Sequence, residues 1–270
     1  MTVYSCFPLG KRKALTMSYD DAAIEDERLV EIFNRYGIKG TFNINYGSYP
    51  IKERLRIPPE RMKTLYAGHE IATHSLSHPT LTLCSLVEVA NQILKDRLGL
   101  EQITGGLVRG HAYPNGCYNQ EIKQLFKQLG IAYARTVDAT YSFNLPEDPM
   151  QWDPTCHHKD PDLMKKAEAF LNYKKTNQLK LMYVWGHSFE FGIDNNWEVI
   201  EEFCRYVGGK EDIWYATNIE IVDYMEAVRN LKFAANNESV YNPSAVSVWL
   251  AVDGRVVEIK GGAYVVLSNV

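Results

Sequence analysis

The stretch that best indicates the fold is residues 13–47, KALTMSYDDAAIEDERLVEIFNRYGIKGTFNINYG. Its first part, 13–21, is a short apolar segment that ends in two acidic residues, which is typical of a buried strand. Residues 25–37 then repeat apolar side chains at three- and four-residue spacing and close with a glycine, which indicates an amphipathic helix. Residues 40–47 form a second apolar segment. A strand, a helix and a strand in this order predict a parallel βαβ unit.

The same alternation continues through most of the chain. Further strands are expected at 69–75, 105–114, 131–137, 179–186 and 212–218, and further helices at 58–68, 85–99, 119–130, 162–175, 196–209 and 219–232. About seven such units predict an α/β fold, a distorted (β/α)7-type barrel, in which reactive groups lie at the C-terminal ends of the strands. Residues 138–160 interrupt the pattern with a polar, aromatic and proline-rich segment. A connection of that length is usually functional or a misassigned element.

The C-terminal residues, 236–270, contain strand-like segments and no helical pattern. Asp253 and Gly254 are placed as the turn of a hairpin. We therefore expect a (β/α) barrel domain over 1–235, followed by a short C-terminal antiparallel β appendage, a β-hairpin extension over 236–270 that packs on the barrel. The extension is expected to cover an end or a side of the barrel, with a role in substrate binding or dimer contact as the alternative.

The composition is that of a globular protein, with 46% hydrophobic residues, 23% charged residues and a net charge of -4. It lacks the basic patches of a nucleic-acid-binding protein. No apolar run approaches the ~20 residues of a spanning helix. The N-terminal segment lacks the basic start and apolar run of a leader, so no leader is expected. We expect a cytoplasmic protein without a nucleic-acid or membrane partner. The widely spaced cysteines are expected to be free thiols: Cys6, Cys84, Cys117, Cys156 and Cys204.

Several reactive side chains fall at the C-terminal ends of the predicted strands. Asp20 and Asp21 end the first, His74 ends another and is followed by His78, and His187 follows a later one. Two imidazoles four residues apart, with a carboxylate from the acid pair, would form the three-ligand zinc site of a hydrolase, in which one position stays open for water. The second acid would remain free as a base. Loop histidines that only hydrogen-bond to backbone are the alternative.

The segments LTMSYDDA, THSLSHP, AYPNG and YVWGHSFE occur in this order, and together they resemble the motifs of the polysaccharide deacetylase family, carbohydrate esterase family 4. The resemblance covers about residues 14–230 and implies the distorted (β/α) barrel of that family. It also implies that Asp20 is the catalytic base and that Asp21, His74 and His78 bind the metal.

Further roles follow from the same resemblance. His187 is implied as the general acid, and Asn115 or a neighbour as the source of a backbone N–H for the oxyanion. Arg109 is implied to orient Asp20, although it lies five residues before Pro114, further than the family motif has it. An ordinary salt bridge is the alternative for this arginine.

Other positions depart from the family pattern. Ala22 stands where the first motif usually has glycine. The fourth motif, an aspartate with a nearby tryptophan, has two candidates here, Asp138 and Asp153, with Trp152.

The remaining candidate residues are aromatic or imidazole side chains near the predicted cleft. Tyr113, Trp152, His157 and His158 are expected to bind substrate. Core packing for the aromatic residues and solvation for the histidines are the alternatives.

The resemblance implies a metal-dependent hydrolase that acts on C–N bonds other than peptide bonds. It would remove acetyl groups from an acetylated sugar or glycan through a metal-activated water, by N-deacetylation or by O-deacetylation. The expected cofactor is one divalent transition metal ion, zinc first, with cobalt, nickel and iron as alternatives. An acetylated carbohydrate is the expected partner, and a homo-oligomer is left open. Two alternatives are an amidase acting on a non-sugar substrate and a non-catalytic carbohydrate-binding relative.

Overall fold

The computed structural model describes residues 1–47, 55–175 and 177–269. Its centre is a curved parallel sheet with the strand order β6-β5-β4-β3-β2-β8-β7, and β9 pairs with β2 outside this path. The strands are β2 (Lys13–Asp20), β3 (Gly40–Ile44), β4 (Glu70–Thr73), β5 (Gly110–Ala112), β6 (Tyr133–Arg135), β7 (Cys156–His157), β8 (Lys180–Gly186) and β9 (Ile213–Tyr215). This arrangement confirms the predicted α/β fold of the distorted (β/α)7 type.

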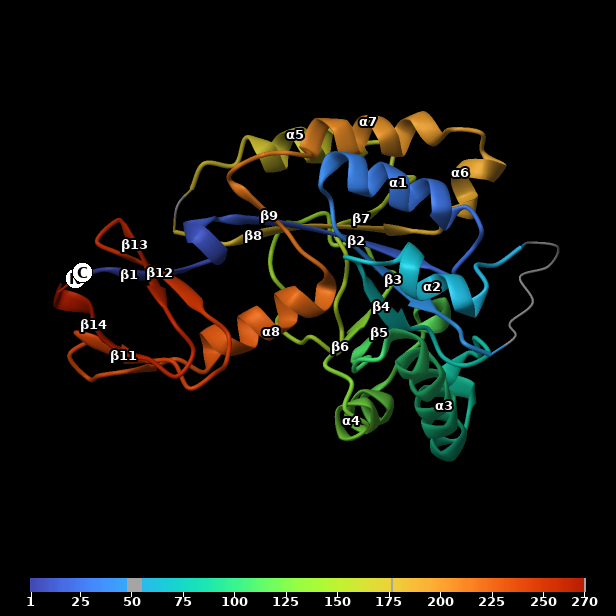
Figure 1. The fold of residues 1–270 in the computed structure, drawn as a ribbon, viewed down its shortest axis with the longest axis horizontal. Coiled ribbons are helices and arrows are strands. Elements are labelled where there is room, and N and C mark those ends of the chain that lie inside the picture. The colour runs from blue at the N-terminus through green and yellow to red at the C-terminus, as the bar shows by residue number, and fades with distance from the viewer. Residues whose placement is uncertain (48–54, 176, 270) are drawn as a thin grey trace.

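Helices cover the outside of this sheet (Figure 1). They are α1 (Asp26–Tyr36), α2 (Pro59–Leu65), α3 (Leu86–Thr104), α4 (Gln120–Gln128), α5 (Leu163–Leu171), α6 (Phe189–Ile193), α7 (Trp197–Val207) and α8 (Asn218–Arg229). Short 3-10 turns are η1 (Pro8–Gly10), η2 (Leu81–Leu83), η3 (Pro114–Gly116) and η4 (Leu267–Asn269). Figure 1 shows α1, α5 and α7 along one side of the sheet. No helix in the described part of the chain is both long and apolar enough to cross a membrane.

Strand β2 is the central strand of the fold, and all of its residues are buried. Its first residues, from Lys13 to Leu15, pair with both β8 and β9, while Met17 to Asp20 pair with β3. Its buried polar residues have partners: Thr16 Oγ1 donates to Asn218 Oδ1 at 2.8 Å, and Ser18 Oγ accepts from Asn43 Nδ2 at 2.8 Å. Asp20, its last residue, therefore lies at the centre of the C-terminal edge of the sheet.

The irregular segment 138–160 contains a strand that the sequence pattern did not reveal. On one side, Trp152 exchanges backbone hydrogen bonds with β6, where its N–H donates to the Ala134 carbonyl at 3.0 Å. On the other side, the Thr155 N–H donates to the Tyr183 carbonyl of β8 at 2.8 Å. The segment thus joins the two edges of the sheet and closes much of the barrel.

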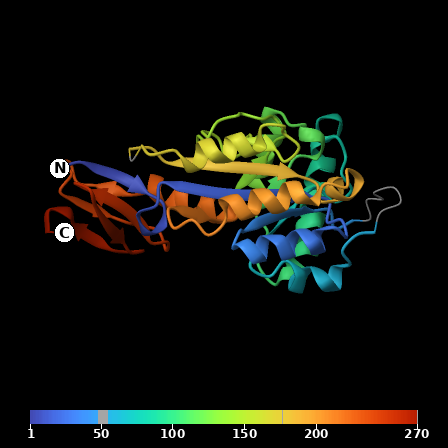
Figure 2. The same ribbon diagram turned by 90° about the horizontal axis from the view of Figure 1, so that it is seen from above.

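The β appendage consists of two three-stranded antiparallel sheets, with the orders β1-β12-β13 and β10-β11-β14. Their strands are β1 (Val3–Cys6), β10 (Lys232–Phe233), β11 (Ser239–Tyr241), β12 (Val248–Val252), β13 (Arg255–Ile259) and β14 (Tyr264–Val266). Figures 1 and 2 show both sheets and both chain ends together at one end of the molecule. The domain division at 235/236 stays a prediction; β1 and β10, which precede it, pair with strands that follow it.

The hairpin turn predicted at Asp253 and Gly254 lies between β12 and β13, whose register pairs Val252 with Arg255. Both turn residues have left-handed backbone, with φ of 46° and 87°. A Cβ added at Gly254 would meet no atom within 4 Å. A substitution there would therefore be unfavourable only because of the left-handed backbone.

We expect Gly254→Ala to lower the free energy of unfolding by about 1–2 kcal/mol, the cost of a left-handed alanine. Gly106→Ala is the matched control, since a Cβ there also meets no atom within 4 Å and the backbone is not left-handed. The control should change the free energy of unfolding by less than about 0.5 kcal/mol. Urea denaturation of the two variants measures the difference, and equal effects would contradict the turn.

Candidate active site

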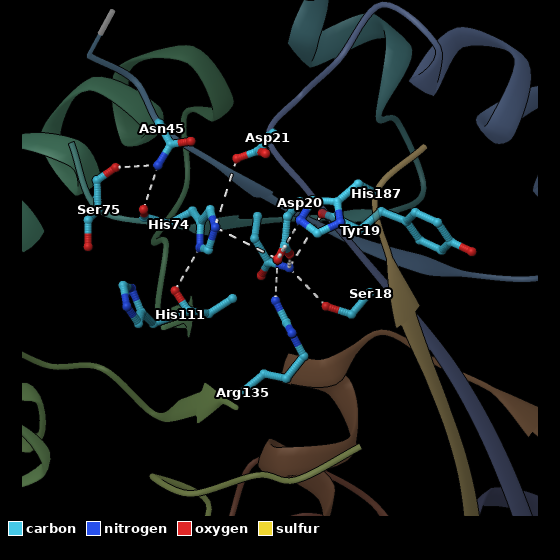
Figure 3. Close-up of polar contacts among 12 residues, drawn as sticks. Ser18, Tyr19, Asp20, Asp21, Asn45, His74, Ser75, His111, Arg135 and His187 are labelled. Carbon is cyan, nitrogen blue, oxygen red and sulfur yellow. Dashed lines mark hydrogen bonds and ion pairs between the residues drawn. The ribbon is translucent and has the colours of Figure 1, made fainter. Parts of the chain in front are cut away.

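Side chains from several strand ends meet at the C-terminal edge of the barrel (Figure 3). Asp20 ends β2, His74 follows β4, Arg135 ends β6 and His187 follows β8. In a parallel barrel these ends share one face, so residues far apart in the sequence become neighbours.

Asp20 is buried and held by two donors. Its Oδ1 accepts a hydrogen bond from Asn43 Nδ2 at 2.8 Å, and its Oδ2 accepts one from Arg135 Nη2 at 2.5 Å. Burial alone would raise the pKa of Asp20, but the Arg135 guanidinium outweighs it, with help from His74 and His187, and lowers the pKa to about 2. Asp20 is therefore an ionised carboxylate in a fixed orientation at neutral pH.

His74 is a buried imidazole whose tautomer follows from its surroundings. Its Nδ1 lies 2.8 Å from the carbonyl oxygen of Ala112. Because a carbonyl only accepts, Nδ1 carries the proton and Nε2 presents its lone pair. Nε2 lies 3.7 Å from Asp20 Oδ2 and 3.9 Å from Asp21 Oδ1. Burial lowers the pKa of His74 and keeps the ring neutral, the form that binds a metal.

Asp21, His74 and His78 form a set of potential metal ligands. Each offers one ligand atom, and these atoms all lie within 4.8 Å of one another. Asp21 Oδ1 is buried without a hydrogen-bond partner, an arrangement that costs free energy unless a cation compensates it. Two imidazoles and a carboxylate are the ligands of catalytic zinc sites. The residues present therefore fit a divalent transition metal ion.

The backbone around this set is strained. Left-handed φ values occur at Asp21 (81°), Ala22 (51°), Ser75 (65°) and His78 (56°). Such residues cost about 1–3 kcal/mol each and persist where their surroundings hold them. Asn45 supplies one such restraint, because its Nδ2 donates to the carbonyl oxygens of His74 and Ser75. Asn45 thus holds the start of the loop that carries the two histidines.

His187 lies between two carboxylates. Its Nδ1 is 3.2 Å from Glu190 Oε2, and its Nε2 is 4.0 Å from Asp20 Oδ2. Burial alone would lower the pKa of His187, but the hydrogen bond to Glu190 and the charges of Asp20 and Asp21 outweigh it and raise the pKa. The ring is thereby favoured in its protonated form.

Glu190 was not predicted as a site residue. It lies on the short helix α6, three residues after His187, and its Oε2 also accepts the backbone N–H of His187 at 3.0 Å. His157 Nε2 reaches the same oxygen at 3.2 Å. The segment YVWGHSFE contains Glu190, but no periodic pattern distinguishes a helix of five residues, so only the i, i+3 spacing could have suggested this contact.

The two histidines predicted to bind substrate have different environments. His157 is partly exposed beside His187, with ring centroids 6.3 Å apart. His158 is buried and stacks between Tyr19 and Phe191, at centroid distances of 5.7 Å and 4.1 Å. Burial lowers the pKa of His158 to about 3, so the ring is neutral. His157 lies at the rim of the site, whereas His158 forms part of the packed layer behind β2.

The structure does not bring Arg109 to Asp20. Arg109 instead forms a bidentate ion pair with Asp223, at 3.0 Å and 2.6 Å. The predicted contact with Asp20 is wrong because Arg109 precedes β5 and lies at the opposite end of the barrel from the site. Arg135, the last residue of β6, makes the contact instead.

Two of the aromatic candidates belong to the core. Trp152 is 1% exposed and packs edge-on against Tyr133 and Tyr183, so its faces are not available to a substrate. Tyr113 is also 1% exposed, donates its hydroxyl to the Met150 carbonyl at 2.9 Å and takes part in ring stacking. The prediction that these two rings bind substrate is corrected to core packing.

The remaining candidates stay near the barrel edge. Asn115 lies in η3 with a left-handed φ of 57°, three residues after the carbonyl that holds His74, and its Nδ2 donates to Thr80 Oγ1 at 3.1 Å. Its oxyanion role stays a prediction. Asp153 accepts a hydrogen bond from Thr136 Oγ1, and the choice between Asp138 and Asp153 for the fourth motif stays a prediction.

The chain is similar to known polysaccharide deacetylases. Residues 9–134 match the family model described as polysaccharide deacetylase. Among curated proteins, the peptidoglycan-N-acetylglucosamine deacetylase PgdA of Listeria monocytogenes serotype 1/2a is 31% identical over 122 residues. This match covers 45% of the present chain and 24% of PgdA, so the chain spans about a quarter of the length of the curated relatives it matches.

Solved structures share the fold over most of the chain. A protein from Mycobacterium smegmatis described as a polysaccharide deacetylase has a TM-score of 0.62 at 18% identity, with 84% of this chain and 94% of that chain covered. A protein from Pseudomonas aeruginosa PAO1 with the same description has a TM-score of 0.63 at 15% identity, with coverages of 80% and 91%. A family 4 carbohydrate esterase from Streptomyces lividans, solved with acetate, has a TM-score of 0.51 at 14% identity, with coverages of 76% and 92%.

The two arginines allow a matched test of the buried ion pair. We expect Arg135→Met to lower the free energy of unfolding by about 3–5 kcal/mol, because it leaves the Asp20 carboxylate buried without its counter-charge. Arg109→Met breaks a pair whose side chains are about one-third exposed, and should cost no more than about 1 kcal/mol. Urea denaturation of metal-free protein at neutral pH measures both. Equal losses would show that the Asp20 contact is not the stronger one.

The role of Glu190 can be measured without a substrate. Because its carboxylate raises the pKa of His187, Glu190→Gln should lower that pKa in metal-free protein. The pH at which the His187 ring resonance titrates in an NMR spectrum reports the change. Asp194→Asn is the control, since Asp194 pairs with Lys159 at 2.8 Å and the imidazole is held by Glu190. An unchanged titration in Glu190→Gln would exclude the proposed contact in solution.

Proposed function

We propose that this chain, whose residues 9–134 belong to the polysaccharide deacetylase family, is a metal-dependent hydrolase that removes acetyl groups from an acetylated sugar or glycan. The observation that carries the proposal is the meeting, at one barrel edge, of an ionised carboxylate, a three-ligand set and a carboxylate-bonded histidine. N-deacetylation is the proposed main reaction, in line with the reaction named for the PgdA relative. O-deacetylation is a variant that the same site would permit.

The proposed ligands of the metal are Asp21, His74 and His78. Zinc suits two imidazoles and a carboxylate, and cobalt, nickel and iron are the alternatives. When bound, such an ion polarises an acyl carbonyl and makes water a stronger acid. The lone pair of His74 Nε2 is kept available for it by the hydrogen bond from Nδ1 to Ala112.

Asp20 is the proposed general base. Its Oδ2 lies 3.7 Å from His74 Nε2, beside the ligand set, and already accepts from Arg135, whereas Asp21 Oδ1 has no hydrogen-bond partner. Asn43 and Arg135 hold both of its oxygens, so the carboxylate needs no reorientation before it accepts a proton from the attacking water. Its charge is present throughout the neutral range because of Arg135.

His187 is the proposed general acid. When the C–N bond of the acetamido group breaks, the amine that leaves requires a proton, and Nε2 of a protonated His187 faces the site to supply it. Glu190 holds the opposite nitrogen, which fixes the ring and favours its protonated form. A backbone N–H near Asn115 is the proposed donor to the developing oxyanion.

The roles of Asp20 and His78 can be separated by one pair of variants. After reconstitution with zinc, Asp20→Asn should retain about one equivalent of metal at the three-ligand site, and should lose roughly 10²–10⁴-fold in acetate release from N-acetylglucosamine oligomers. His78→Ala should lose both the metal of that site and the activity, because a ligand is gone. Elemental analysis and an acetate assay measure these outcomes.

His69→Gln is the control for this pair, since His69 accepts a hydrogen bond from the Gly40 N–H, lies outside the site, and should leave metal and activity intact. Circular dichroism checks that each variant folds. Normal turnover by Asp20→Asn would remove this residue from the mechanism. Retained metal with no turnover of any acetylated sugar by the unaltered protein would favour a carbohydrate-binding relative.

A further inference from the structure

A second group of potential metal ligands lies beside the proposed catalytic set. His157, His187 and Glu190 each offer one ligand atom, and these atoms all lie within 4.8 Å of one another. They come from three places in the fold: the end of β7, the residue after β8, and helix α6. None of them is a member of the Asp21, His74 and His78 set.

The geometry of this second group converges on one oxygen. Glu190 Oε2 lies 3.2 Å from His157 Nε2 and 3.2 Å from His187 Nδ1. Nitrogen and oxygen ligands about 2.0–2.1 Å from a tetrahedral zinc are separated by similar distances. The three side chains are between 15% and 24% exposed, so an ion can reach them from solvent.

A fourth imidazole adds an independent observation. His158 is 2% exposed, and neither of its ring nitrogens has a hydrogen-bond partner. Its Nε2 faces the same Glu190 oxygen at 3.5 Å. A buried polar group without a partner costs free energy, and an ion at this point would offer the ring a ligand position.

We propose that His157, His187 and Glu190, with His158 beside them, form a second site for a divalent transition metal ion. Two imidazoles and a carboxylate, with a third imidazole in reach, favour zinc, copper or nickel over magnesium or calcium. The two ligand sets share no residue. His187 turns Nδ1 toward the second site and Nε2 toward Asp20.

Neighbouring groups make this second site the weaker of the two. Lys159 Nζ lies 3.2 Å from the other oxygen of Glu190, although it is also paired with Asp194 at 2.8 Å. The Lys159 N–H donates to His157 Nδ1 at 3.1 Å, and this hydrogen bond must be released when Nε2 binds an ion. The second site should therefore have the lower affinity for zinc of the two.

Occupancy of the second site has a consequence that rests on the proposed function. An ion on His187 Nδ1 prevents this nitrogen from holding a proton, so the ring can no longer be the doubly protonated acid. The second ion should inhibit deacetylation. The site would make activity fall when zinc exceeds the amount needed by the catalytic set.

The test is the zinc stoichiometry of metal-free protein by equilibrium dialysis, which requires no substrate. The unaltered protein should bind about two equivalents in two affinity classes. His157→Gln should lose the weaker class, His78→Ala the tighter class, and the double variant both. His69→Gln is the control and should keep both classes. Circular dichroism and melting curves confirm folding, and Glu190→Gln provides a second route to the same loss.

The outcomes separate the two proposals. A single class that His78→Ala removes and His157→Gln leaves would overturn the second site while supporting the catalytic one. A class that only His157→Gln removes, with His78→Ala unchanged, would support the second site and remove the proposed catalytic ligand. Where both classes are found, acetate release should fall as the second fills in the unaltered protein. Full activity with both classes filled would overturn the inhibitory role.

Discussion

The buried ion pair between Asp20 and Arg135 is the interaction on which the arrangement of the site depends. It joins the last residue of the central strand β2 to the last residue of β6 at the far edge of the sheet. Arg135 is fully buried, lies 4.4 Å from the centre of the Trp185 ring, and donates to the Thr136 carbonyl at 3.0 Å. A buried guanidinium is tolerated only where such partners replace water. The pair therefore fixes the charge of Asp20 and ties one edge of the sheet, β6, to the central strand β2.

That constraint also explains which parts of the site could be predicted. Motifs carried by strand ends were located correctly, because Asp20 and His74 lie in short segments whose strand pattern is strong. The arginine was misplaced because proximity in sequence to the AYPNG motif favoured Arg109. Only the three-dimensional register shows that Arg109 precedes its strand whereas Arg135 ends one.

Other parts of the molecule could not be read from periodicity at all. Strand β7 has two residues, and the segment before it is rich in proline and polar side chains. The pairing of β7 with β8 and of Trp152 with β6 is therefore a tertiary effect. Helix α6 is too short to show an amphipathic repeat, which hid Glu190. Trp152 has an aromatic ring of the kind that stacks on sugars, but the segment 138–160 places it in the buried core of the barrel.

The segment that closes the barrel also supplies the surroundings of His187, the proposed acid. The segment that pairs with β8 through Thr155 also delivers His157 and His158 to Glu190, because only one residue separates Thr155 from His157. Gly186 is required for this approach, since a Cβ there would lie 2.0 Å from His158 Nδ1. His187 itself follows the well-predicted strand β8, but its neighbours His157 and His158 depend on β7, which the local sequence barely encodes. Asp20, the proposed base, belongs to the central strand of the sheet, and the surroundings of His187, the proposed acid, belong to its closing edge.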